Sequence, residues 1–407
     1  LSNRSELKSL HRQAEAALLS AEALAAIASL SGMTYPTGDL GESFRSLLFC
    51  QQHDTLGGAC LPGNYDYAEM LLRGVRDRAA WVEGAAMRHL AARVPAPAGD
   101  YGIVVANPLG FRRSAVVSLD AEPGTSRQSR YRVTRSDGRE VNWQVVRTRS
   151  GDRLQIAAEE VPAYGFETYS VVRLADATQF TPHDPAPGAD RVEARVDPEA
   201  IRIENDVVRV LLDKHDAQII SYFDKRHERE RLTGGRKGNV LEVHYENPGD
   251  ASLDAFGTIT SVEPLASRED TTVTDQGPYV GRVRVTRRYR SSVIEQTFTL
   301  RAGSPRLEVE THYYWREPPH GDEPSPILRV AFPAAEGEGL SARFGVPYGE
   351  VALGPDGSER AGLSYGALTG PAGGLALLTE DRHGFSASAD GTLRMTLLRT
   401  RFQPMNP

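Results

Sequence analysis

An adjacent histidine and aspartate, His53 and Asp54, form the most unusual polar feature of the sequence, in the segment Cys-Gln-Gln-His-Asp-Thr-Leu-Gly-Gly at positions 50–58. Imidazole is a common metal ligand, and the glycines that follow allow a ligand or another backbone to approach closely. Consecutive residues are poorly placed to chelate one ion together, and a catalytic zinc commonly has three protein ligands. A metal at His53 therefore needs further ligands from elsewhere. The pair also fits a structural role, because a protonated histidine is stabilised at a helix C-terminus and an aspartate bonds nearby amides.

The other histidines show no paired metal-ligand spacing, and each is expected to be an ordinary surface or capping residue; they include His89, His183, His215, His227, His244, His312 and His383. The sequence also lacks a Gly-x-Ser-x-Gly elbow, a phosphate loop and a Gly-x-Gly-x-x-Gly after a strand. Serine-hydrolase, nucleotide and dinucleotide chemistry therefore have no support.

The composition limits the classes of partner that the protein can bind. The net charge of −7 comes from 54 acidic and 47 basic residues that are intermixed, which argues against nucleic-acid binding. No apolar run reaches the roughly 20 residues of a membrane span. Cys50 and Cys60 are too few for a disulfide framework or a cysteine-built zinc site. They are predicted to be reduced thiols, although they could pair under oxidation, and a cytoplasmic location is expected.

Three amphipathic helices are expected to position His53 and Asp54. Apolar residues recur at three- and four-residue steps over residues 4–30 and 65–92. Between them, Asp39 has the position of a helix cap, with Glu42 at capping-box spacing, and this second helix is predicted to run into the glycine pair after His53. The pattern indicates a three-helix bundle that ends at the proline-containing segment 94–100.

Beyond the bundle, short β-branched and aromatic segments alternate with turn residues, as is typical of strands. A 407-residue chain exceeds the size of one growing core. The expected fold class is multidomain α + β: a three-helix bundle over 1–95, a small β-sandwich over 96–180 and a large antiparallel β-sandwich over 191–407, truncated at its C-terminus. The strands predicted in the two sandwiches cover residues 103–106, 115–119, 141–146, 168–172, 202–212, 281–289, 292–300 and 307–315.

The segment from Phe49 to Tyr65 resembles a segment of the glycoside hydrolase family 38 α-mannosidases that reads approximately Asn-Gln-Phe/His-His-Asp-Ile-Leu/Thr-Pro/Thr-Gly-Ser/Thr-Ser. In that family the histidine is a zinc ligand, and the aspartate contacts sugar hydroxyls near the metal. The resemblance therefore implies that His53 is a metal ligand and that Asp54 binds substrate. Cys50, Gln52, Gly57 and Cys60 depart from the family pattern.

Further segments resemble the same family in the same order, and they cover nearly the whole chain. They include the Asn-Pro-Leu-Gly phrase at 107–110, Val-Pro-Ala-Tyr-Gly at 161–165, Ile-Glu-Asn-Asp at 203–206, Phe-Asp-Lys at 223–225 and Phe-Gly-Val-Pro-Tyr-Gly at 344–349. Most of these residues are expected to form turns or to pack, as Trp315 and Tyr348 are. Segment 247–256 lies where the family often has a tryptophan-bearing loop, and a structural role is favoured there over a sugar contact.

The resemblance implies a mannosidase middle domain followed by a mutarotase-like supersandwich. It also implies a retaining, metal-dependent α-mannosidase that acts on terminal α-mannosides of a mannose-containing oligosaccharide, with Zn²⁺ or another divalent metal as cofactor. In the family the nucleophile belongs to an N-terminal catalytic domain, which this sequence lacks, so the fragment is expected to be inactive by itself.

Two other functions stay open. One is a non-catalytic carbohydrate-binding or scaffold module that uses sandwich aromatics. The other is a mutarotase-like epimerase, for which His312 with Glu308 or Glu310 is the strand candidate. Self-association into a homo-oligomer is also left open.

Overall fold

The structure, a computed structural model, describes residues 5–57, 60–95, 99–120, 130–148, 151–174, 191–247, 249, 251, 256–265, 268–277, 279–317, 323–371 and 373–400. These residues form two compact units, one within Glu6–Ala189 and one within Asp190–Pro407. The first unit contains helices and a small β-domain, and the described part of the second contains strands. The predicted order of a helical region followed by antiparallel sheets is confirmed.

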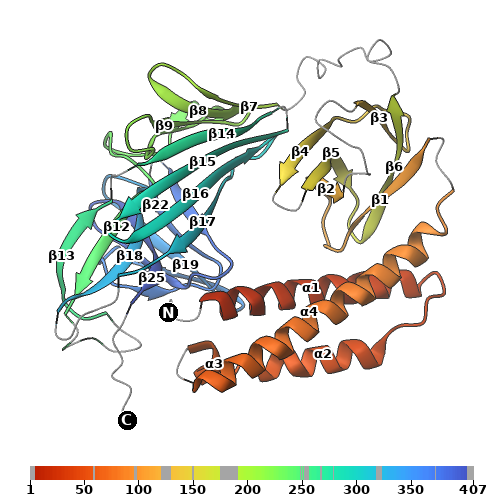
Figure 1. Ribbon diagram of the computed structural model, residues 1–407, viewed down its shortest axis with the longest axis horizontal. Coiled ribbons are helices and arrows are strands. Elements are labelled where there is room, and N and C mark those ends of the chain that lie inside the picture. Colours follow the sequence, from red (N-terminus) through yellow and green to blue (C-terminus); the bar gives the residue numbers. More distant parts are fainter. Residues whose placement is uncertain are drawn as a thin grey trace. The chain divides into compact units, whose positions relative to one another are not determined.

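Three long helices form the bundle: α1 (Ser5–Ser29), α2 (Thr37–Phe49) and α4 (Pro62–Ala91). They lie side by side, and the short helix α3 (His53–Gly57) joins α2 to α4 (Figure 1). The predicted apolar stripes are buried, because residues three and four positions apart share one helix face. The core of the bundle contains Leu7, Leu10, Ala14, Leu18, Ala21, Leu40, Leu47, Leu72, Val75, Ala79 and Val82.

The predicted cap of the second helix is wrong. The helix begins at Thr37, directly after Pro36, and no side chain caps it. Asp39 lies in the first turn, where its charge favours the helix dipole. Both proposed capping residues instead face Arg78 of α4, Asp39 at 3.9 Å and Glu42 at 2.7 Å. The third helix begins at Pro62 rather than at Tyr65, since proline is favoured in the first helical turn.

Two small antiparallel sheets form the β-domain of the first unit. One has the order β1 (Tyr101–Asn107), β6 (Gly165–Leu174) and β3 (Arg130–Arg135). The other has the order β2 (Arg113–Asp120), β5 (Gly151–Val161) and β4 (Trp143–Thr148). Both sheets contribute to one apolar core, which includes Tyr131, Val133, Leu154, Ile156, Tyr169 and Val171.

The second unit consists of stacked antiparallel sheets. One has the order β11 (Arg229–Glu230), β10 (Ile219–Asp224), β9 (Val208–Asp213), β8 (Ala200–Asn205) and β7 (Val192–Val196). Another has the order β14 (Asp270–Gln276), β15 (Val280–Tyr289), β16 (Ser292–Arg301) and β17 (Leu307–Tyr314). A third has the order β20 (Gly349–Leu353), β19 (Ser341–Val346), β22 (Tyr365–Gly370) and β23 (Gly373–Leu378).

The remaining sheet has the order β13 (Ile259–Pro264), β12 (Val240–Glu246), β18 (Ser325–Pro333), β25 (Thr392–Arg399), β24 (Gly384–Ala387) and β21 (Arg360–Ala361). We call it the β18 sheet. One of its faces is apolar and packs into the main core of the unit, to which Leu241, Val243, Leu328, Val330 and Leu397 belong. Its opposite face is polar, and this face is described below.

The strand predicted over 202–212 is instead the hairpin of β8 and β9. Asn205, which is buried, makes the break: its side-chain oxygen accepts hydrogen bonds from the backbone N–H groups of Val207 (2.9 Å) and Val208 (2.7 Å). Its side-chain amide donates to the carbonyl oxygens of Arg301 (2.7 Å) and Ser304 (2.8 Å). The predicted turn-forming role of Asn205 is therefore confirmed.

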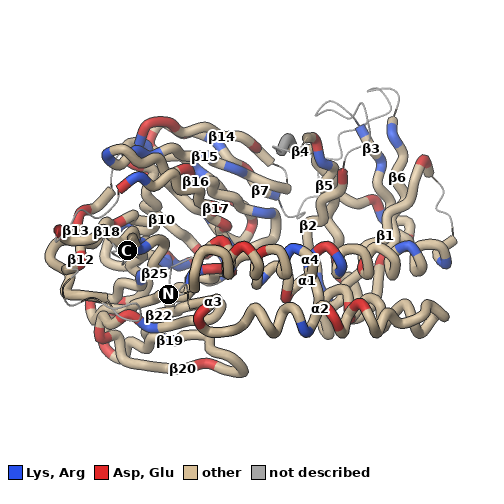
Figure 2. Tube along the Cα trace, turned by 60° about the horizontal axis from the view of Figure 1, so that its bottom comes forward, with Lys and Arg blue, Asp and Glu red and all other residues tan. Residues whose placement is uncertain are grey.

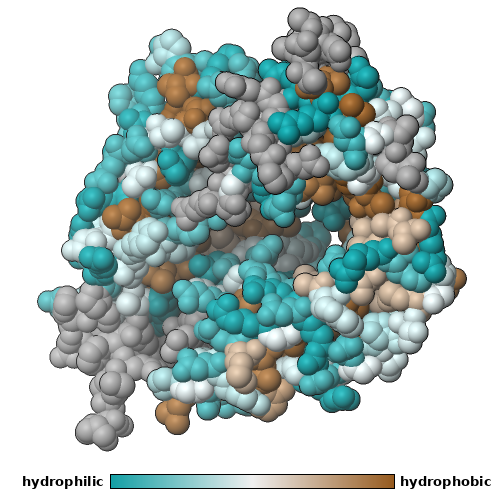
Figure 3. Space-filling model, turned by 45° about the vertical axis from the view of Figure 1, so that its right-hand side comes forward, coloured by the Kyte–Doolittle hydropathy of each residue, from teal (hydrophilic) through white to brown (hydrophobic). Residues whose placement is uncertain are grey.

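The surface of the second unit carries intermixed charges. Basic and acidic residues are interspersed along β14 to β17 (Figure 2), and exposed pairs such as Arg301–Glu308 join neighbouring strands. On the face drawn in Figure 3, hydrophobic residues form separate groups among hydrophilic ones. Among the described residues, no helix has the length and apolar character that crossing a membrane requires.

Candidate functional site

His53 and Asp54 lie on α3, at the connection between α2 and α4. Both side chains are open to solvent, with exposed fractions of 89% for His53 and 54% for Asp54. The imidazole Nε2 lies 3.5 Å from Oδ1 of Asp54. The sequence predicted that the second helix would continue into this segment, but α2 ends at Phe49 and the pair occupies the start of its own helical turn. The structure thus presents both side chains outward rather than placing them in the bundle core.

Gln52 positions the aspartate. Its side-chain oxygen accepts a hydrogen bond from the backbone N–H of Thr55 at 3.0 Å, and its amide donates to Oδ2 of Asp54 at 2.9 Å. Gln52 therefore acts as the N-terminal cap of α3 and also fixes the carboxylate. Capping by glutamine is uncommon, which explains why the sequence pattern did not indicate a helix start here.

The segment after α3 is held by Tyr65, which is buried at the start of α4. The Tyr65 hydroxyl accepts a hydrogen bond from the backbone N–H of Cys60 at 2.8 Å. Cys60 and Cys50 are both free cysteines in the structure. Burial raises the pKa of the Cys50 thiol, whose sulfur donates to the carbonyl oxygen of Ala68 at 3.8 Å. Both cysteines thus serve the local fold around α3.

The described residues contain no group of three His, Cys, Asp or Glu side chains that could hold a metal ion. His53 nevertheless offers an imidazole that is 89% exposed, and imidazole nitrogen is a donor that zinc commonly takes. The residues around α3 therefore fit one part of a metal site and would need donors from beyond the described residues to complete it.

The strand candidate for an epimerase does not converge on a site. His312 lies 3.0 Å from Glu310 on the exposed side of β17, and Glu308 is paired with Arg301 at 2.9 Å. These side chains form a solvated strand face.

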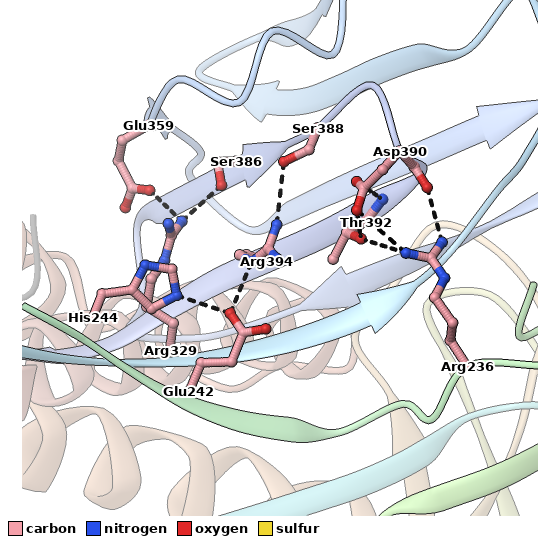
Figure 4. Close-up of polar contacts among 10 residues, drawn as sticks. All are labelled: Arg236, Glu242, His244, Arg329, Glu359, Ser386, Ser388, Asp390, Thr392 and Arg394. Atoms are coloured by element: carbon pink, nitrogen blue, oxygen red, sulfur yellow. Dashed lines mark hydrogen bonds and ion pairs between the residues drawn. The ribbon is translucent and has the colours of Figure 1, made fainter. Parts of the chain in front are cut away.

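A second polar cluster lies on the polar face of the β18 sheet, and the sequence analysis missed it. Glu242 and His244 are two positions apart on β12, so they share one face, and His244 Nε2 lies 2.8 Å from a Glu242 oxygen (Figure 4). Arg394 of β25 donates to the same oxygen at 2.8 Å. The alternation of Glu242, His244 and Glu246 with apolar neighbours was a readable signal for a polar strand face.

The same face continues through Arg329 of β18. This buried guanidinium donates to Glu359 at 2.6 Å and to Ser386 at 2.7 Å (Figure 4). Thr396 donates to the other oxygen of Glu359 at 2.6 Å. Farther along, Arg236 bonds Thr392 and Asp390, as Figure 4 shows. Each carboxylate of this cluster is thus already neutralised by an arginine.

This electrostatic pattern disfavours acid–base chemistry on the β18 sheet. Burial by itself would raise the pKa of Glu242, but the hydrogen bonds from His244 and Arg394 outweigh it and lower the pKa to about 2. A general base works best with a pKa near the operating pH. Glu242 and His244 also contact each other directly, so they do not flank a sugar ring as an epimerase requires. We regard this face as a structural ion-pair network.

Segment 247–256 is described only in part, but its end is anchored on that network. The ring of Phe256 lies 4.9 Å from the guanidinium carbon of Arg399 and 5.6 Å from that of Arg329. The backbone N–H of Gly257 donates to Glu246 at 3.0 Å. Phe256 therefore packs against two guanidinium groups.

Two of the aromatic residues singled out in the sequence have different environments. Trp315 stacks on Tyr289 with ring centroids 5.8 Å apart, and its indole N–H donates to Thr400 at 3.0 Å, so its packing role is confirmed. The packing role predicted for Tyr348 is wrong. Tyr348 has a φ of 63° in the two-residue turn between β19 and β20, which leaves its side chain fully exposed.

Comparisons with known proteins identify the lineage of this architecture. The sequence pattern described as "Alpha mannosidase middle domain" matches residues 1–90, and "Glycosyl hydrolases family 38 C-terminal domain" matches residues 203–406. The order of a helical domain followed by antiparallel sheets is thus the order of the middle and C-terminal domains of a glycoside hydrolase. The chain belongs to glycosyl hydrolase family 38. No curated protein matches the chain in sequence.

Solved structures share the fold at low sequence identity. A family 38 protein from Enterococcus faecalis has a TM-score of 0.78 at 15% identity, with 98% of this chain and 53% of that chain covered. An α-mannosidase from Enterococcus faecalis V583 has a TM-score of 0.76 at 15% identity, with 98% and 51% covered. The chain therefore spans about half the length of these structures.

Proposed function

We propose that this chain, together with the rest of a longer polypeptide, forms a retaining, metal-dependent α-mannosidase that hydrolyses terminal α-mannosides of oligosaccharides or glycans. The observation that carries the proposal is the exposure of His53 and Asp54 on α3, inside the segment that matches the mannosidase middle domain. Family 38 membership and the α-mannosidase among the similar structures support the choice of reaction.

In this proposal, His53 binds a divalent metal, and Asp54, held by Gln52, binds sugar hydroxyls beside it. When bound, a zinc ion supplies Lewis acidity and a fixed point for vicinal hydroxyls. Asp54 accepts hydrogen bonds from those hydroxyls, and the outward orientation of α3 leaves both side chains free for a sugar and for further ligands. The expected cofactor is Zn²⁺, and the expected partner is a mannose-containing oligosaccharide in the cytoplasm.

The two carboxyl groups of a retaining glycosidase lie about 5–5.5 Å apart on either side of the scissile bond. We place both outside this chain, because the carboxylates gathered on the β18 sheet are bound by Arg394, Arg329 and Arg399. A carboxylate held by an arginine stays ionised and does not protonate a leaving group, and among these groups the pKa of Glu242 is lowered. We therefore expect the 407-residue chain alone to be inactive.

Metal analysis of the longer polypeptide tests the role of His53. The purified protein should hold about one zinc per chain, and His53→Ala should lose most of it, since removing one of a few ligands sharply lowers affinity. His312→Ala is the matched control, because His312 also lies exposed beside a carboxylate, and it should leave the metal content unchanged. Equal metal content in the wild type and in His53→Ala would contradict the assignment.

One observation favours the carbohydrate-binding alternative. Tyr348 is fully exposed at the tip of a hairpin, where an aromatic ring can stack on a sugar. Mannan binding that is lost in Tyr348→Ala but kept in His53→Ala would support this function. The α-mannosidase proposal predicts the reverse dependence.

A further inference from the structure

Strand β20 is an edge strand that lacks the usual protection of such an edge. It is the first strand of its sheet, so β19 pairs with one side of it and no described strand pairs with the other. Edge strands are commonly protected by a bulge, by lysine or by proline. The register of β20 with β19 runs without a shift, and the strand contains neither lysine nor proline. Figure 2 shows β20 beyond β19, at the bottom rim of the second unit.

The single charged residue of β20 does not protect the edge either. The carboxylate of Glu350 accepts a hydrogen bond from Arg343 of β19 at 2.7 Å and another from the hydroxyl of Tyr365 on β22. Both partners belong to the same sheet as β20. These bonds therefore hold the carboxylate over its own sheet rather than beyond the open edge.

Two side chains of β20 extend an apolar face of the sheet to this edge. Residues that oppose one another in neighbouring strands lie on the same face, and Val351 opposes Phe344 while Leu353 opposes Ala342. Phe344 and Ala342 are buried in an apolar core. Val351 and Leu353 are 41% and 37% exposed, so the apolar face continues past its cover. A second strand at this edge would remove further apolar surface from water.

The hairpin of β19 and β20 determines which backbone groups point to the open edge. A two-residue turn joins the strands, and the pair of residues that closes such a turn exchanges both of its hydrogen bonds. Bonded and non-bonded pairs alternate from there, so Gly345 and Glu350 form a non-bonded pair. The carbonyl oxygen of Gly345 accordingly accepts a hydrogen bond from the backbone N–H of Leu363, which precedes β22, at 2.7 Å. The backbone N–H and C=O groups of Glu350, and of Ala352 two positions later, therefore point away from β19.

We propose that β20 pairs with β20 of a second copy of this chain, antiparallel about a two-fold axis that passes between the two Val351 residues. This inference is independent of the proposed function. In this register the backbone of Glu350 bonds that of Ala352 in the other copy, and the symmetry gives about four hydrogen bonds. The two Val351 side chains meet in a non-bonded pair, where opposed side chains are closest. Each Glu350 opposes an alanine, so no like charges face one another.

The other two-fold registers of this strand fit less well. A register centred on Glu350 would place two carboxylates directly opposite one another, which is destabilising. A register centred on Ala352 would pair Glu350 with Gly354, whose carbonyl oxygen already accepts the backbone N–H of Asp356 at 3.0 Å. The charges and free backbone groups of β20 are thus complementary to those of the same strand in a second copy, and this complementarity identifies the occupant.

Sedimentation velocity of the 407-residue chain over a range of concentrations tests the proposal. A strand of 5 residues buries little area, so we expect a reversible dimer with a Kd on the order of 10–100 µM. Val351→Lys brings two ammonium groups face to face and should raise the Kd at least about tenfold. Val196→Lys changes an exposed valine of β7 in the same unit and should leave the Kd unchanged. Both variants should keep the melting temperature of the wild type, because neither valine is buried.

A mixture of two charge variants tests the register. Val351→Glu alone should weaken the dimer as Val351→Lys does, because like charges again face one another. An equimolar mixture of the two variants should associate again, because opposite charges then meet across the axis. Loss of folding could not produce this rescue. Hydrogen exchange adds an independent measurement: the amides of Glu350 and Ala352 should exchange more slowly as the protein concentration rises, whereas the amide of Val351, which is bonded to β19, should change little.

Four results would overturn the proposal. The first is a wild-type chain that stays monomeric well above the expected Kd, and the second is an equal Kd for Val351→Lys and Val196→Lys. A mixture of the two Val351 variants that fails to associate would refute the two-fold register. A longer polypeptide that is monomeric, and in which the Glu350 amide exchanges slowly at every concentration, would identify another segment of that polypeptide as the occupant of the edge.

Discussion

Removing one partner of the ion pair between Glu246 and Arg399 should strongly destabilise the second unit. The pair is bidentate at 2.7 and 2.8 Å, and the exposed fractions are 0% for Glu246 and 7% for Arg399. Glu246→Gln leaves the buried guanidinium without its counter-charge and weakens the anchor of Gly257. Removing one partner of a buried pair costs about 3–5 kcal/mol, and at about 2–4 °C per kcal/mol the melting temperature should fall by roughly 6–20 °C.

Differential scanning calorimetry of the 407-residue chain measures this change, with Glu308→Gln as the matched control. Glu308 pairs with Arg301 at similar distances, but the two side chains are 46% and 31% exposed, so its loss should cost about 0–1 kcal/mol. The double variant Glu246→Gln, Arg399→Met should be less destabilised than the sum of the two single variants, because no lone buried charge remains. A change below 1 kcal/mol for Glu246→Gln, or strict additivity in the double variant, would refute the reasoning.

Three further predictions concern individual side chains. Burial lowers the pKa of His11 below 6.5 in the bundle. The stability that depends on neutral His11 is therefore present above that pH and is lost as the pH falls. The melting temperature should drop between about pH 7 and pH 5, and His11→Gln should reduce this drop. Asn205→Ala should destabilise the second unit by about 2–4 kcal/mol in urea titrations, because it leaves backbone groups at two turns unpaired. A loss under 1 kcal/mol would count against the role of Asn205 in these turns. Iodoacetamide should modify Cys60 at least about tenfold faster than Cys50 in the native protein, and equal labelling by mass spectrometry would contradict the burial of Cys50.

The helices and the family were readable from sequence because their signals are local. The apolar stripes of α1 and α4 follow a fixed period, and the buried face of each helix was predicted from it. The alternation of Leu307, Val309 and Thr311 with Glu308 and Glu310 likewise predicted a half-buried strand, and β17 has that pattern.

The missed features depend on residues that are distant in sequence. The start of α3 depends on a glutamine cap that no common pattern includes. β18 is buried along its whole length, so it has no alternation to read. The pairing of Glu242 with Arg394 joins residues 152 positions apart, and composition alone cannot show that these charges share one sheet face.

The sequence could propose the residues of the candidate site but not their geometry. The resemblance selected His53 and Asp54, and the structure adds that both are exposed on a helix of their own and that Gln52 holds the carboxylate. Sequence reasoning could not supply this, because the outward orientation follows from the break between Phe49 and His53.

Turnover of an aryl α-mannoside tests the central claim most directly. Equal molar amounts of the longer polypeptide and of the 407-residue chain should be assayed side by side with added zinc. The account predicts hydrolysis by the longer polypeptide, a loss of at least about a hundredfold in its His53→Ala variant, and none by the 407-residue chain. Hydrolysis by the 407-residue chain, or full activity of the His53→Ala variant, would contradict it.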